Sequence, residues 1–127
     1  MIRIYGIDNR LNPIKTRLSG VINRCMVEAL SFPDDKRAHR FFPMSDEDYF
    51  YLEGRSAAYT VIEISMMAGR SVEAKKRLIH LLFKHIETEL GIAPADIEIT
   101  IHESLPCNWG FRGITGDEAK LNYKIDV

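Results

Sequence analysis

The sequence contains few of the residues that mark disulfide-bonded, metal-binding or membrane-spanning proteins. Cys25 and Cys107 are its only cysteines, too few for the disulfide framework of a small secreted domain. Its four histidines lack the spacing of zinc ligands, and no apolar stretch approaches the length of a membrane span. We therefore expect a cytoplasmic protein with reduced thiols, no cofactor and no membrane association.

The chain also lacks an excess of charge of either sign. Lys and Arg number 17 against 18 Asp and Glu, for a net charge of −1. Nucleic-acid-binding domains usually carry a clear positive excess, so we expect no nucleic-acid partner. A hydrophobic content of 46% over 127 residues is enough for a real core. We therefore predict a single domain spanning residues 1–127.

The apolar pattern predicts short strands that alternate with two amphipathic helices. Apolar residues three and four apart predict a helix through 18–30 and a second helix after Ser71, a good N-cap, that ends at Gly91. β-Branched or alternating apolar residues predict the strands, which we place at 2–7, at 37–44, from Thr60 onward, at 97–102 and at 123–127.

Two connections between these elements are predicted to be irregular. Residues 8–13 have the composition of a turn. Residues 45–58 form a polar connection that is long for a small domain and includes Tyr49, Phe50 and Tyr51. These aromatics either anchor the loop on the core or line a pocket or a subunit contact.

The two halves of the chain repeat the order strand, helix, strand, over about 1–44 and 59–104, and a tail follows. Tandem βαβ units give parallel strand pairs with right-handed crossovers. We therefore predict an α/β (α+β) fold with a four-stranded sheet and both helices on one face. Isoleucines on both sides of such a sheet predict a homo-oligomer that buries the other face.

Arg70 is the first candidate functional residue, because it stands where the third strand ends and the second helix begins. Backbone N–H groups and the positive end of the helix dipole point the same way at such a junction. A fixed guanidinium there suits a small carboxylate. The alternative is that Arg70 only caps or solvates a turn.

The cysteines are weaker candidates. Cys25 lies in the middle of the apolar stripe of the first helix, which predicts a core thiol. Cys107 is either a small packed residue, the interpretation that we favour, or a reactive thiol near Trp109.

The order of motifs in the chain resembles the tautomerase superfamily, and most closely its malonate semialdehyde decarboxylase-like branch. The residues that carry the resemblance are Gly54-Arg55-Ser56, Arg70-Ser71, the segment 91–96, Asn108-Trp109-Gly110-Phe111 and Thr115-Gly116-Asp117. The resemblance implies a homotrimer with sites between subunits and a small carboxylate or oxo acid as ligand. It also implies that Arg70 and Arg55 bind substrate and that Trp109 and Phe111 form an aromatic wall.

The sequence departs from that family at its amino terminus. The family's chemistry is carried by an amino-terminal proline that is exposed when the initiator methionine is lost, whereas position 2 here is Ile2. A bulky β-branched residue there is expected to hinder removal of Met1. Lys36 also falls where the branch has a catalytic aspartate, although Asp35 is next to it, and Ala68 stands where the branch has a second arginine. The α-amine of Met1 titrates near neutral pH and can act as a base in place of proline.

Two functions follow from these residues. The first is a weak keto–enol tautomerase or a decarboxylase of small oxo acids, with Met1 and Arg70 as catalytic residues. The second is a catalytically inactive trimer of the same fold that binds a carboxylate or a partner subunit.

Overall fold

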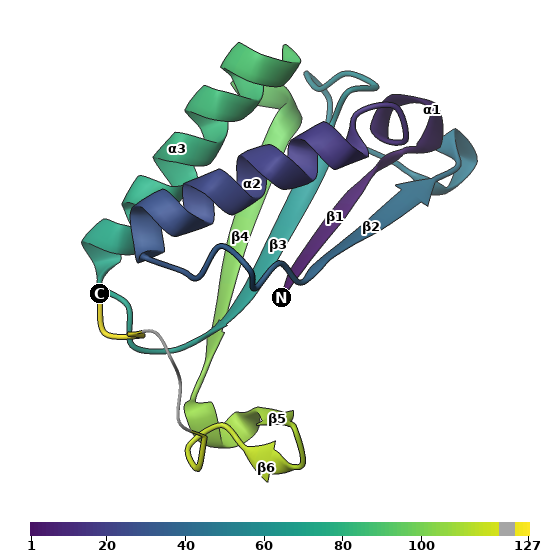
Figure 1. Cartoon of the computed structure of the whole chain (residues 1–127). Helices are drawn as coiled ribbons and strands as arrows, with labels where there is room; N and C mark the ends of the chain where they lie inside the picture. Colours follow the sequence, from purple (N-terminus) through teal and green to yellow (C-terminus); the bar gives the residue numbers. More distant parts are fainter. Residues whose placement is uncertain (120–123) are drawn as a thin grey trace.

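The computed structural model describes residues 1–119 and 124–127. A four-stranded sheet lies beneath two long helices, and a small hairpin extends beyond one end of the sheet (Figure 1). The elements are β1 (Ile2–Ile7), α1 (Asp8–Leu11), α2 (Lys15–Leu30), β2 (His39–Met44), β3 (Thr60–Met67), α3 (Val72–Leu90), β4 (Ile97–Ser104), β5 (Gly110–Phe111) and β6 (Ile114–Thr115). Short 3₁₀ turns occupy Asp46–Asp48, Pro94–Asp96 and Pro106–Asn108.

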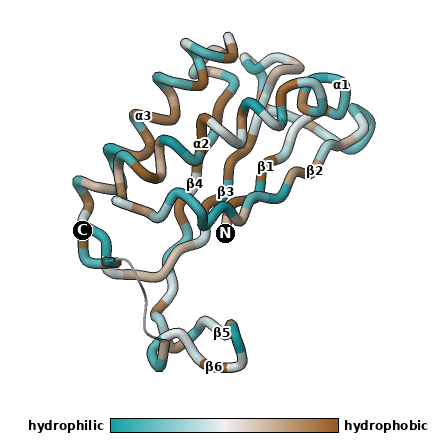
Figure 2. Tube along the Cα trace, in the orientation of Figure 1, coloured by the Kyte–Doolittle hydropathy of each residue, from teal (hydrophilic) through white to brown (hydrophobic). Residues whose placement is uncertain are grey.

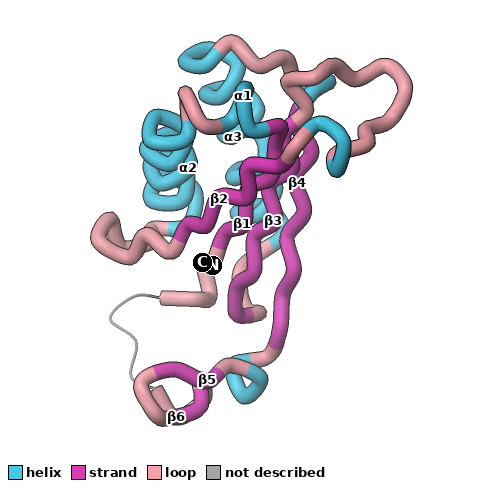
Figure 3. The backbone as a smooth tube through the Cα atoms, turned by 90° about the vertical axis from the view of Figure 1, so that its right-hand side faces the viewer, coloured by secondary structure: helices cyan, strands magenta, loops and turns pink. Residues whose placement is uncertain are grey.

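The sheet confirms the predicted fold class. Its strand order is β2-β1-β3-β4. β1 pairs in parallel with β2, β3 pairs in parallel with β4, and β1 pairs antiparallel with β3 at the centre. Each parallel pair is joined through a long helix, as a parallel connection requires. Both helices lie on the same side of the sheet, as Figure 3 shows from the edge.

The core lies between the sheet and the helices. Figure 2 shows hydrophobic residues along the strands and at intervals along the two long helices. Fully buried isoleucines of the central strands, Ile4, Ile62 and Ile64, belong to one cluster with Leu78 and Leu82 of α3. The isoleucines of β4 pack against the same cluster or belong to it.

Isoleucines lie on both sides of the sheet, as predicted, but unevenly. Alternation along the strands places most of them toward the helices, because residues two apart share a face. The opposite face holds Ile7, which packs with Tyr5 and Val61, and otherwise carries mainly charged and aromatic side chains. Arg3 pairs there with Glu63 at 3.4 Å, and the rings of Tyr5 and Phe42 stack with their centroids 4.9 Å apart.

Both ends of α3 follow the predicted capping. The Ser71 side chain accepts a hydrogen bond from the backbone N–H of Ala74 at 3.1 Å, as an N-cap does. Gly91 ends the helix with φ of 70° and donates its N–H to the Glu87 carbonyl. A left-handed residue at this position favours glycine because other residues meet a Cβ clash.

Residues 8–11 form a short helix rather than the predicted turn. Leu11 is 1% exposed and belongs to the core cluster, so burial of this side chain favours a helical turn in this segment. The Asn12 N–H donates to the Asp8 carbonyl at 3.0 Å, and Pro13 follows without an N–H of its own.

Two strand predictions also need correction. The second strand begins at His39 rather than at residue 37, because the pairing register with β1 starts there. In the predicted strand 123–127, Tyr123 lies outside the described residues, and 124–127 form no strand. That segment instead meets the start of α3, where the Ser71 N–H donates to the Val127 carbonyl at 2.8 Å.

The long connection after β2 is anchored by aromatic residues, as one of the two interpretations predicted. Tyr49 and Tyr59 are buried against Ile7 in a second small cluster, and the Tyr49 hydroxyl donates to the Tyr59 carbonyl at 3.0 Å. Phe50 is 91% exposed and Leu52 is 61% exposed, so the tip of this loop presents apolar surface. Among the described helices, none is long and apolar enough to cross a bilayer.

Candidate active site

The amino terminus lies where three strands come together. The register pairs Ile2 with Ile64 of β3 and with His39 of β2. Met1 therefore lies beside Ser65, and the two residues exchange backbone contacts. The Met1 amine donates to the Ser65 carbonyl at 2.9 Å, and the Ser65 N–H donates to the Met1 carbonyl at 2.8 Å. These two bonds fix the position of the amine.

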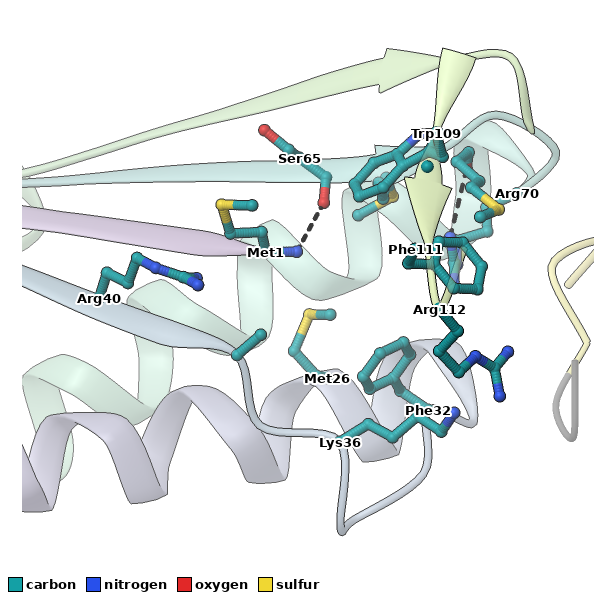
Figure 4. A pocket seen from close by; sticks show the side chains of 14 residues that line it. Met1, Met26, Phe32, Lys36, Arg40, Ser65, Arg70, Trp109, Phe111 and Arg112 are labelled. Atoms are coloured by element: carbon teal, nitrogen blue, oxygen red, sulfur yellow. Dashed lines mark hydrogen bonds between the residues drawn. The ribbon is translucent and has the colours of Figure 1, made fainter. Parts of the chain in front are cut away.

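A cavity of about 480 Å³ opens in front of this amine. Figure 4 shows the Met1 nitrogen directed into it, with side chains from β2, β3, α2 and the β5–β6 hairpin around it. The lining includes four cationic side chains, namely Lys36, Arg40, Arg70 and Arg112. It also includes the aromatic side chains Phe32, Trp109 and Phe111. No aspartate or glutamate is among the described residues that line it.

The cavity changes the acidity of the amine. Burial lowers the pKa of the Met1 ammonium below its ordinary value of 8.0, and the charges of Arg3, Arg40 and Arg70 lower it further. Both causes disfavour the protonated form, because desolvation and nearby positive charge raise the energy of a cation. A larger fraction of this amine is therefore neutral at pH 7 than of an exposed α-amine.

Arg70 lies in the cavity wall, as the sequence predicted, at the start of α3. Its side chain is buried, with 7% of the residue exposed, and one guanidinium nitrogen donates to the Met67 carbonyl at 3.3 Å. The glycine before it, Gly69, has φ of 141°. That conformation favours glycine and lets the chain turn from β3 into the helix.

Trp109 and Phe111 line the cavity from the hairpin, where the resemblance placed an aromatic wall. The Gly116 N–H donates to the Trp109 carbonyl at 2.8 Å and closes the hairpin. A Cβ on Gly116 would come within 2.4 Å of the Pro106 carbonyl oxygen, so the close approach requires glycine. Arg112 lies 5.1 Å from the Phe111 ring centroid, in the range of a cation–π contact.

The structure does not bring Arg55 into this cavity. Arg55 precedes β3, whereas Met1 and Arg70 lie at the other end of that strand, and eight residues of strand span roughly 25 Å. The loop is held there by Ser56, whose hydroxyl donates to Asp96 at 2.6 Å. Binding of substrate by Arg55 stays a prediction that needs a second subunit.

The cysteine predictions had different outcomes. Cys25 is a core thiol, as predicted, and is 1% exposed, and burial raises its pKa to about 11. Cys107 is exposed on the turn before the hairpin, so the favoured interpretation of a packed residue is wrong. The turn projects from the end of β4 and leaves the thiol without a core to pack against.

Sequence reasoning missed Arg40 as a site residue. The signal was available in the predicted parallel pairing of β1 with β2, which places the start of β2 beside the amino terminus. Arg40 stands one residue after His39, the register partner of Ile2, and makes no ion pair among the described residues. Phe32 was missed because it follows α2 in a segment without periodicity.

The remaining candidates for chemistry lie outside the cavity wall. His39 accepts from or donates to the Ser19 hydroxyl at 2.8 Å, and burial lowers its pKa to about 4 with help from the charges of Arg37 and the amino terminus. Within residues 1–119 and 124–127, no group of three or more His, Cys, Asp or Glu side chains could hold a metal ion.

Comparison with known proteins decides the family. Residues 36–112, more than half of the chain, match the profile of a family described as tautomerase enzymes. The chain belongs to this tautomerase family. Over 115 residues it is 28% identical to the probable tautomerase YusQ of Bacillus subtilis (strain 168), covering 87% of this chain and 91% of the relative.

A shorter relative matches one part of this tautomerase-family chain. The 2-hydroxymuconate tautomerase of Comamonas testosteroni is 32% identical over 56 residues, which cover 44% of this chain and 89% of that protein. A tautomerase less than half as long thus corresponds to about the length of one βαβ unit. This agrees with a fold built from two such units.

Solved structures share the fold. FG41 malonate semialdehyde decarboxylase, inhibited by 3-bromopropiolate, has a TM-score of 0.79 at 24% identity and covers 87% of this chain and 88% of its own. A fused 4-OT described as an asymmetric trimer has a TM-score of 0.80 at 21% identity and covers 91% of this chain and 95% of its own. The predicted tautomerase-like architecture is therefore confirmed.

Proposed function

We propose that this protein catalyses keto–enol tautomerisation of small 2-oxo acids that carry an apolar or aromatic substituent. One observation carries the proposal. The amine of Met1, whose pKa is lowered, shares a cavity with several cationic side chains and an aromatic wall, and no carboxylate lines that cavity among the described residues. Such a cavity favours an anion with an apolar part.

Each group has a role in this reaction. Arg70 and Arg40 bind the carboxylate, since guanidinium groups suit planar oxyanions. Trp109 and Phe111 contact the apolar substituent and exclude water, which strengthens the charge contacts. The neutral Met1 amine removes the proton from the enol hydroxyl, and the resulting ammonium returns a proton to the neighbouring carbon. The amine is neutral again at the end of the cycle.

A tautomerase fits the site better than a decarboxylase of the same fold. The resemblance assigns a catalytic aspartate to the position of Lys36, and the described lining holds no acid that could take its place. A general base is sufficient for enol-to-keto conversion, because the same group can remove and return the proton. The decarboxylase of small 3-oxo acids is therefore the less favoured of the two activities.

The second candidate is a binding protein that holds a small carboxylate without turnover. Met1 keeps a full side chain beside the amine, and an Arg3 guanidinium nitrogen approaches its sulfur at 3.4 Å. A side chain at this place competes with substrate for space, which disfavours fast turnover but leaves the carboxylate contacts intact. Binding of phenylpyruvate without turnover at any pH would establish this alternative.

We also propose a homotrimer. Support comes from the fold relatives described as trimers and from exposed apolar side chains, Phe42 at the edge strand and Phe50 and Leu52 on the loop. In such an assembly a neighbour can supply Arg55, which cannot reach the cavity of its own chain. Light scattering coupled to size exclusion should give three times the chain mass, and a monomer would contradict the assembly.

The test of the activity is the ultraviolet assay of phenylenolpyruvate ketonisation. Arg70→Ala should lower kcat/KM by about 10- to 100-fold, since a hydrogen bond to a charged group contributes about 1.5–3 kcal/mol. Arg70→Lys should lower kcat/KM less than Arg70→Ala does, mainly through a higher KM, because lysine keeps the charge but lacks the planar pair of donors. Arg10→Ala is the matched control, because Arg10 lies on α1 at the far end of β1.

Circular dichroism should show the same fold in all variants, because Arg70 is buried and its removal can also destabilise the start of α3. Equal rates for the native protein and folded Arg70→Ala, or no ketonisation above buffer by the native protein, would overturn the proposed function.

A further inference from the structure

The amine at this site is a primary amine, and this changes the chemistry available to it. A neutral primary amine is a nucleophile as well as a base, and it can condense with a carbonyl group to a neutral imine. Enzymes activate such an amine by desolvation in an apolar pocket or by a neighbouring cation. Both conditions hold at Met1, which lies in the cavity wall with Arg3, Arg40 and Arg70 around it.

The geometry also holds the amine and a carbonyl group together. Two backbone hydrogen bonds to Ser65 fix the Met1 backbone at 2.9 and 2.8 Å. Arg40 and Arg70 line the same cavity on different sides of the amine, as Figure 4 shows. A 2-oxo acid whose carboxylate contacts either guanidinium has its carbonyl carbon one bond away, within the space that the amine faces. Such positioning raises the effective concentration of the reactants.

We propose that the Met1 α-amine forms a Schiff base with small 2-oxo acids bound in this cavity. The inference rests on the carboxylate site of the proposed function but uses the amine as a nucleophile. The nitrogen lone pair attacks the carbonyl carbon, the carbonyl oxygen takes up a proton from the nitrogen, and a carbinolamine results. Loss of this hydroxyl with a proton as one water molecule leaves the carbon–nitrogen double bond.

The Schiff base also gives a route by which the hydrogen on the carbon next to the carbonyl exchanges with solvent. Once protonated on nitrogen, it withdraws electrons from the neighbouring carbon, which loses a proton to give an enamine. Return of a proton to that carbon and hydrolysis by one water release the 2-oxo acid and the amine. Atoms and electrons balance without an oxidant or reductant. The carbonyl oxygen is exchanged with water in each cycle, whereas proton transfer by a base alone leaves that oxygen in place.

Reductive trapping tests the inference on the full-length protein. Phenylpyruvate with sodium cyanoborohydride should add, to one site per chain, the mass of the acid less one oxygen atom. Peptide mapping should place the adduct on the Met1 nitrogen. The control ligand is phenylacetone, which lacks the carboxylate and should trap at least about tenfold more slowly, since one charged contact is lost. The control protein is the same chain in denaturant, where amines should react without preference for Met1.

The outcomes separate this inference from the proposed function. No adduct, an adduct on Lys36, or labelling spread over lysines as in denaturant would overturn the Schiff base, even if ketonisation persists. An adduct on Met1 in a protein without ketonisation would uphold the Schiff base and overturn the tautomerase.

Oxygen exchange gives a second readout. Oxygen-18 from labelled water should enter the carbonyl of phenylpyruvate faster with native protein than with amino-terminally acetylated protein, and equal rates would contradict the inference.

Discussion

Acetylation of the Met1 amine should abolish most of the turnover without unfolding the protein. The amine donates one hydrogen bond, to the Ser65 carbonyl at 2.9 Å, and an amide N–H at the same place can still donate it. What the acetyl group removes is the basic lone pair. The modification therefore separates the structural role of this nitrogen from its chemical role.

The magnitude follows from the role assigned to the amine. A positioned general base contributes about 10²- to 10⁴-fold to a proton-transfer step, so kcat for phenylenolpyruvate should fall by that factor. The cationic side chains of the cavity remain, and the affinity for a carboxylate should change little. Loss of kcat with nearly constant binding is the pattern expected when a group acts on the reacting proton.

The assay needs a control for bulk, because the acetyl group occupies part of a cavity of about 480 Å³. A formyl group on the same nitrogen is smaller and equally non-basic. If basicity is decisive, formylated and acetylated proteins lose the same activity, whereas steric exclusion predicts a smaller loss for the formyl group. Peptide mapping must confirm modification at Met1, and thermal melts must match the native protein. Acetylated protein that retains kcat within about threefold would refute a general base worth at least about 10²-fold.

Three further predictions concern the amino terminus, Arg40 and His39. Insertion of a proline between Met1 and Ile2, with removal of the methionine, should raise kcat/KM. The prolyl nitrogen then occupies the place of the Met1 amine, while Ile2 keeps its buried position. Lower activity in a folded variant from which the methionine has been removed would contradict this. Arg40→Gln should move the rising limb of the kcat/KM–pH profile to higher pH, toward 8.0, because it removes one of the charges that lower the amine pKa, and an unchanged profile would count against that contact. His39 should titrate near pH 4 by NMR rather than near 6.5. Because the unfolded state binds the proton first, the free energy of unfolding should decline as pH falls from 6.5 toward 4, by up to about 2 kcal/mol after allowance for partial exposure. The His39→Gln variant should show a smaller decline.

The helices and strands were largely determined by local sequence. The apolar stripe after Ser71, with its N-cap and with Gly91 at its end, was sufficient to place α3, because capping and periodicity act within a few residues. The repeat of strand, helix and strand was sufficient for the sheet and its two parallel pairs, because a parallel pair needs a crossover. The helix at residues 8–11 was not predicted from the local sequence, because it is favoured by burial of Leu11 against distant residues and not by local propensity.

The sequence also indicated part of the site. Arg70 was predicted from its place between a strand and a helix, and the family resemblance added Trp109 and Phe111. All three line one cavity with Met1. The resemblance alone suggested a defective site, because it compared Ile2 with the family's proline.

Only the tertiary structure decided which nitrogen faces that cavity. The antiparallel pairing of Ile2 with Ile64 buries the Ile2 side chain in the core and brings the Met1 amine to Ser65. Arg40 reaches the same place through a different strand pair. The lowered pKa of the amine arises from burial and from the charge of the nearby Arg3, and further from Arg40 and Arg70, which are distant in sequence. Burial and the two distant charges depend on distances that no local pattern encodes. The sequence by itself thus determined most of the elements, the family resemblance and one arginine, whereas the packing of three strands placed the Met1 amine in the wall of the cavity.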